Sequence, residues 1–112
     1  MPTQIDIKKT GAEMLEAMKT ILGKHFSEVK KMAIGELEDF AKRTIELAEK
    51  VNNGEITQAQ AKAILKIRQN AVETVMLSIA GIGLLAAQEA INAAIGILIS
   101  VLKKAIPGVN LF

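Results

Sequence analysis

The chain has 112 residues, of which 50% are hydrophobic and 23% charged, with a formal net charge of +2. This length supports one hydrophobic core, so residues 1–112 are expected to form a single domain. Aromatic residues make up only 3% of the chain and cysteine is absent, which excludes disulfides and argues against base-stacking surfaces. Lysine and arginine occur in isolated pairs rather than in a basic tract, so nucleic acid is not an expected partner.

The first half of the sequence is typical of an amphipathic helix. From about residue 10 to residue 52, apolar residues recur at steps of three and four, and charged residues occupy the other face. Gly23 and Gly35 interrupt the pattern, and each costs about 1 kcal/mol relative to alanine inside a helix. Either glycine is a candidate kink or break, and Gly23, followed by Ser27, fits a stop and a restart of the helix.

A turn is predicted near the midpoint of the chain. Asn52, Asn53 and Gly54 tolerate the left-handed backbone that ends helices, and Thr57 and Gln60 match a capping box. A second helix is therefore expected to start at residue 58. Because the connection is short, the two arms should pack as an antiparallel hairpin.

The second arm is expected to run from about residue 58 to residue 105, before Pro107 and Gly108. Unbroken, it would be about 70 Å long, and Gly81-Ile82-Gly83 is its candidate break. The predicted fold class is thus all-α: a long antiparallel helical hairpin, with arms 10–52 and 58–105 and candidate breaks at Gly23 and Gly81–Gly83, that assembles into a helical bundle.

Residues 75–102 form an almost continuous apolar run with two different surfaces. One is rich in glycine and alanine, and the other repeats bulky side chains about every seven residues. A two-arm monomer would cover only one of these surfaces, so the sequence predicts an obligate homo-oligomer, a dimer or larger. The alternative is a compact monomer, if Gly23 and Gly81–Gly83 both break their arms to give a four-helix bundle. The predicted interface residues are Leu77, Gly83, Leu84, Ala86, Ala90, Ile91, Ala94, Ile95, Leu98 and Leu102.

The few polar residues of this run fall on one helical stripe, which consists of Ser78, Gln88, Glu89, Asn92 and Ser100. Two alternatives remain open for it. The stripe is either the water-facing edge of a buried helix, or a polar seam or pore lining where several copies meet.

Catalytic motifs are weak or missing. Residues 81–86 read GIGLLA and fit a dinucleotide-binding fingerprint, but no acidic residue follows at the spacing that would bind a ribose. His25 is the only histidine and has no partner at a metal-binding or catalytic-triad spacing. We therefore expect no enzyme activity, no cofactor, no metal site and no small-molecule substrate.

These patterns favour a non-enzymatic, self-associating helical structural or interaction protein. The alternative is a small membrane-active protein, of pore-forming or lysis-accessory type, that inserts residues 75–102. The N-terminal sequence does not match a secretory signal, so a cytoplasmic location is expected, with membrane association under the alternative. Insertion of a lone helix is marginal, since Glu89 alone costs about 3 kcal/mol against roughly 4.5 kcal/mol gained from isoleucine and leucine.

Overall fold

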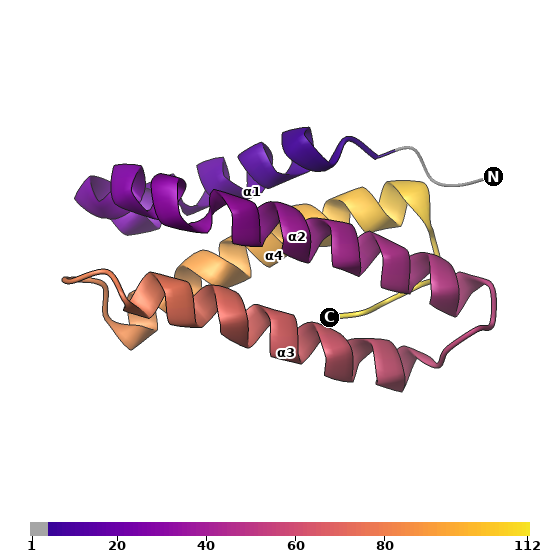
Figure 1. The fold of residues 1–112 in the computed structure, drawn as a ribbon. Helices are drawn as coiled ribbons and strands as arrows, with labels where there is room; N and C mark the ends of the chain where they lie inside the picture. The colour runs from indigo at the N-terminus through magenta and orange to yellow at the C-terminus, as the bar shows by residue number, and fades with distance from the viewer. Residues whose placement is uncertain (1–4) are drawn as a thin grey trace.

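The computed structural model describes residues 5–112, which form four α-helices and one short 3-10 turn (Figure 1). The helices are α1 (Ile7–Leu22), α2 (Phe26–Asn52), α3 (Gln58–Leu77) and α4 (Leu84–Ala105), and the 3-10 turn η1 (Gly23–His25) separates the first two. No strand occurs among these residues. The all-α prediction is confirmed, and both arms of the predicted hairpin are broken at the expected glycines.

The first arm is itself a hairpin because Gly23 ends α1. Gly23 has a φ of 54°, in the left-handed region that favours glycine, and its N–H donates a hydrogen bond to the Lys19 carbonyl. The chain then reverses, and α2 returns along α1 (Figure 1). The two helices come very close at Gly11, where a Cβ would lie 2.8 Å from Cγ of Glu38.

The predicted capping box starts α3. The Thr57 hydroxyl accepts a hydrogen bond from the Gln60 N–H at 3.1 Å, and the Thr57 N–H donates to the Gln60 side-chain oxygen at 2.9 Å. These bonds satisfy two backbone groups that the first helical turn leaves free.

The second break covers residues 78–83. The Ser78 hydroxyl donates to the Val75 carbonyl at 2.6 Å as α3 ends. Gly81 has a φ of 94°, and the side chains of Ile79 and Ile82 are buried on either side of it. The connection is thus anchored in the core, and α4 returns antiparallel to α3.

The four helices form an up-down-up-down bundle of 43 × 24 × 18 Å. Helix α1 contacts α2 and α4, and α3 contacts α2 and α4, whereas α1 and α3 lie on opposite sides (Figure 1). The radius of gyration of 13.9 Å is close to the roughly 13 Å expected for a compact chain of this length. The described residues of one chain therefore pack into a compact bundle.

Residues 106–112 close the bundle at the end where α2 turns into α3. Ile106 and Leu111 are buried, and the Phe112 ring lies 6.2 Å from the Phe40 ring, measured between centroids. The Asn110 N–H donates to the Gln58 side-chain oxygen at 3.1 Å. This segment joins α2, α3 and α4 in a second, smaller core cluster.

Candidate interaction surface

Most of the predicted interface lies inside a single chain. Six of its ten residues are buried on the face of α4 that meets the rest of the bundle, chiefly α1. Because both arms break, one chain has three other helices with which to cover α4, rather than the single arm on which the prediction of an obligate oligomer depended. Both breaks occur, which is the condition under which the sequence also allowed a compact monomer, and the oligomeric state stays a prediction. The six buried residues are Ala90, Ile91, Ala94, Ile95, Leu98 and Leu102.

The other four predicted interface residues lie around the α3–α4 connection. Leu77 is 40% exposed and Leu84 is 53% exposed; Gly83 is exposed and Ala86 is half-buried. Leu85, which the prediction did not include, is 70% exposed. The connection is therefore flanked on both sides by leucines that the bundle does not cover.

The polar stripe faces solvent within one chain. Its five residues, Ser78, Gln88, Glu89, Asn92 and Ser100, are all exposed. Gln88 and Asn92 line one wall of a shallow cleft of about 200 Å³, and side chains of α3 line the other. No other element of the described chain covers the stripe.

His25 packs at the end of the bundle where both arms break. A Cβ on Gly81 would lie 2.7 Å from Cε1 of His25, so the imidazole rests directly on the glycine of the second break. The two breaks are thereby held side by side. Residues 5–112 contain no cluster of three histidine, cysteine, aspartate or glutamate side chains that could hold a metal ion.

The glycines of the GIGLLA motif also have structural roles. Helix α3, not a strand, precedes them, and Gly83 is the residue before the first turn of α4. The void that Met14, Phe40 and Ile91 help to line in the bundle interior measures about 10 Å³, room for roughly one water molecule. A small-molecule ligand does not fit there.

The surface that sequence reasoning missed is the outer face of α3. Ile64 is 40% exposed and Ile67 is 70% exposed, while Leu65 and Val72 on the opposite face are buried. The signal was present in the spacing of apolar residues at steps of three and four. It was overlooked because the interface prediction considered only the apolar run of residues 75–102.

Comparison with protein-family models, with curated proteins and with solved structures gave no match for this chain.

Proposed function

We propose that this chain is a non-enzymatic helical interaction protein that associates with copies of itself through apolar surface on α3 and the start of α4. One observation carries the proposal. The described residues have six large hydrophobic side chains that stand clearly exposed, and five of them lie within residues 64–85. They are Ile64, Ile67, Leu77, Leu84 and Leu85; the sixth is Met32 on α2.

Concentration of apolar side chains on one segment favours association. Scattered surface hydrophobic residues are normal in a monomer, whereas a continuous apolar surface usually marks a contact site. The segment contains two helix surfaces without a partner in the bundle, and helices bury such surfaces best against other helices. The self-association we propose joins folded bundles, since each chain already has a complete core.

The test is the molar mass of the full chain in plain buffer, measured by light scattering from about 10 µM to about 1 mM, the range in which weak association is detected. We expect the mass to rise toward that of a dimer or larger species. Met32→Ser should not alter this rise, because Met32 lies outside the segment. A mass that stays monomeric throughout would contradict the proposal.

A second candidate function is membrane activity, and one observation favours it. Within residues 5–112, α4 is the one helix long and apolar enough to cross a membrane, judged by length and composition. In the bundle it packs against α1, so insertion would require the bundle to open. This cost makes membrane activity the second candidate.

Gly96→Arg separates membrane activity from the leading proposal. Gly96 is exposed in the bundle and a Cβ there meets nothing within 4 Å, so the folded state tolerates the change. A charge near the centre of an inserted helix costs about 2.5–3.5 kcal/mol. Membrane activity predicts dye release from liposomes that Gly96→Arg abolishes and that Gly35→Arg, at an equally open site on α2, retains. The leading proposal predicts no release by any of the three proteins.

A further inference from the structure

We infer that α3 of one chain pairs with α3 of a second copy, antiparallel and across a twofold axis, as a short coiled-coil seam. The inference rests on the proposed self-association and names the surface and the geometry through which it occurs.

The outer face of α3 has the spacing of a coiled-coil seam. Ile64, Ile67, Ala71 and Thr74 follow one another at steps of three, four and three residues, and all four are exposed. None is charged. This spacing keeps a stripe of side chains facing a partner helix. Figure 1 shows α3 along one edge of the bundle, with no helix beyond it.

The seam is complementary to itself only in the antiparallel direction. With the twofold axis near residue 69, Ile67 lies over Ala71 of the second copy, and Ile64 lies over Thr74 of the second copy. Each layer then pairs one large side chain with one small one, which keeps the two helix axes evenly spaced. A parallel pair would place isoleucine on isoleucine at one end and alanine on alanine next to it, leaving a gap.

One flank of the seam also pairs large side chains with small ones. In an antiparallel pair, residues on one flank meet the same flank of the partner helix, so Leu77 lies over Ala63 of the second copy. Asn70 then meets Asn70 of the second copy at the axis, where the two amides can exchange hydrogen bonds. All three residues are exposed in the single chain. Large and small side chains thus complement each other on the flank as well as on the seam.

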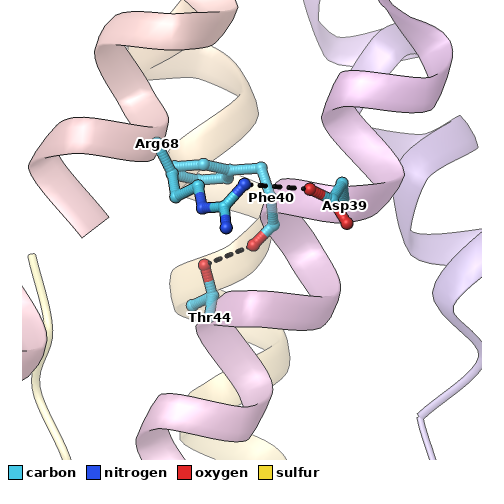
Figure 2. A network of polar contacts seen from close by, with 4 residues as sticks. All are labelled: Asp39, Phe40, Thr44 and Arg68. Carbon is cyan, nitrogen blue, oxygen red and sulfur yellow. Dashed lines mark hydrogen bonds and ion pairs between the residues drawn. The ribbon is translucent and has the colours of Figure 1, made fainter. Parts of the chain in front are cut away.

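The other flank carries a charge that must be compensated. Arg68 lies there and would approach Arg68 of the second copy near the axis. Its guanidinium is already 3.3 Å from a carboxylate oxygen of Asp39 on α2 (Figure 2). The pair is neutral overall, so two such pairs can meet without net repulsion. Lys66 and Glu73 line the cleft toward α4 and lie away from the seam.

A second copy suits this surface better than lipid does. Only two isoleucines stand on the seam, and its other members are small or polar, which gives little area to insert into a bilayer. Small residues instead allow close helix approach. A strip about 30 Å long and about 10 Å wide is below the size of a standard stable interface, so we expect a weak dimer with a dissociation constant on the order of 100 µM.

Two charge substitutions at exposed apolar side chains test the location. Ile67 is 70% exposed and Met32 is 49% exposed, so neither Ile67→Glu nor Met32→Glu should disturb the fold. We expect Ile67→Glu to weaken dimerisation at least tenfold in sedimentation equilibrium, because a charge would be buried against Ala71 of the second copy. Met32→Glu, on α2 and outside the proposed surface, should change the dissociation constant less than twofold. Circular dichroism of both variants should match the wild type.

Cysteine cross-linking tests the direction, and the natural chain contains no cysteine to interfere. A disulfide needs Cα atoms within about 7 Å. Antiparallel pairing predicts that a mixture of Ile67→Cys and Ala71→Cys chains oxidises to a covalent dimer in much higher yield than either variant alone. Parallel pairing predicts efficient cross-linking of each variant with itself. Glu46→Cys, exposed on α2, is the control for random collision.

The outcomes separate this inference from the proposed function. Leu85→Glu changes the other part of the proposed surface, at the start of α4. A dimer that resists Ile67→Glu but is lost in Leu85→Glu would overturn the α3 seam and keep self-association. Efficient cross-linking of each variant with itself would overturn the antiparallel geometry. A wild-type chain that stays monomeric at about 1 mM, roughly ten times the expected dissociation constant, would overturn both proposals. Binding to liposomes that Ile67→Glu abolishes would assign the surface to lipid instead.

Discussion

At the scale of single residues, glycine determines where this chain turns and how closely its helices approach. Gly23 and Gly81 adopt positive φ values at the two breaks. Gly11 has a different role, because it lies within α1 and lets α2 approach until Glu38 occupies the space that a side chain would fill. Gly35 lies in α2 with open space around it. The same residue type is thus essential at some positions and replaceable at others.

Gly11→Val should lower the free energy of unfolding by about 1–3 kcal/mol, because its side chain would overpack the contact between α1 and α2. The matched control is Gly35→Val, which should change stability by less than about 0.5 kcal/mol. Urea denaturation monitored by circular dichroism measures both. Equal effects at the two positions would show that the close approach at Gly11 does not contribute to the free energy of unfolding.

Glu89 is exposed within one chain, so Glu89→Lys should change stability by less than about 0.5 kcal/mol. The seam or pore-lining alternative for the polar stripe instead predicts a large loss of stability, since the lysines introduced into several copies would then meet in an assembly. Thermal unfolding of both proteins, at the same high and low concentrations, distinguishes the alternatives. A large loss that appears only at high concentration would support the seam.

At the scale of elements, local signals predicted where helices begin and end, but not which surfaces meet. Gly23, Gly81 and the capping box at Thr57 act on the backbone within a few residues, so the sequence alone was enough to place the breaks and the midpoint turn. Sequence periodicity shows that a helix has an apolar face without identifying its partner. For that reason Ile91 was assigned to a contact between chains, although it packs within one.

Thr57→Ala should destabilise the protein by about 1 kcal/mol, because the first turn of α3 loses a hydrogen bond to the Gln60 N–H. Thr57 is exposed, so loss of packing contributes little. Thr57→Ser keeps the hydroxyl and should remain within a few tenths of a kcal/mol of the wild type. The midpoint of urea unfolding reports both changes. Similar losses for serine and alanine would exclude the cap as the cause.

At the scale of the whole molecule, the decisive fact is that both arms fold in half. The bundle is 43 Å in its longest dimension, compared with about 70 Å for the unbroken second arm. Because both arms fold in half, one face of the apolar run, which includes Ile91, Leu98 and Leu102, lies in the core of a single chain. The contact of Phe112 with Phe40 was not predictable, because residues far apart in the sequence leave no periodic signal when they meet.

Two aspartate substitutions test this arrangement. Ile91 is 4% exposed, whereas Leu84 is 53% exposed at the start of α4. Ile91→Asp should cost several kcal/mol, comparable with the total stability of a small domain, because it buries an unpaired charge. Leu84→Asp should be neutral or slightly stabilising, since a negative charge is favourable at a helix N-terminus. Unfolding by Leu84→Asp with tolerance of Ile91→Asp would require a different arrangement of α4.

The packing of α4 against α1 joins two helices that lie far apart in the sequence. Loop closure over most of the chain is slow compared with formation of the local α1–α2 hairpin. We therefore expect docking of α4 to come late, with its apolar face uncovered until then. During that interval the exposed apolar face is open to association with other chains. The bundle's yield in a cell then depends on how fast its two ends meet, and not only on how stably they pack.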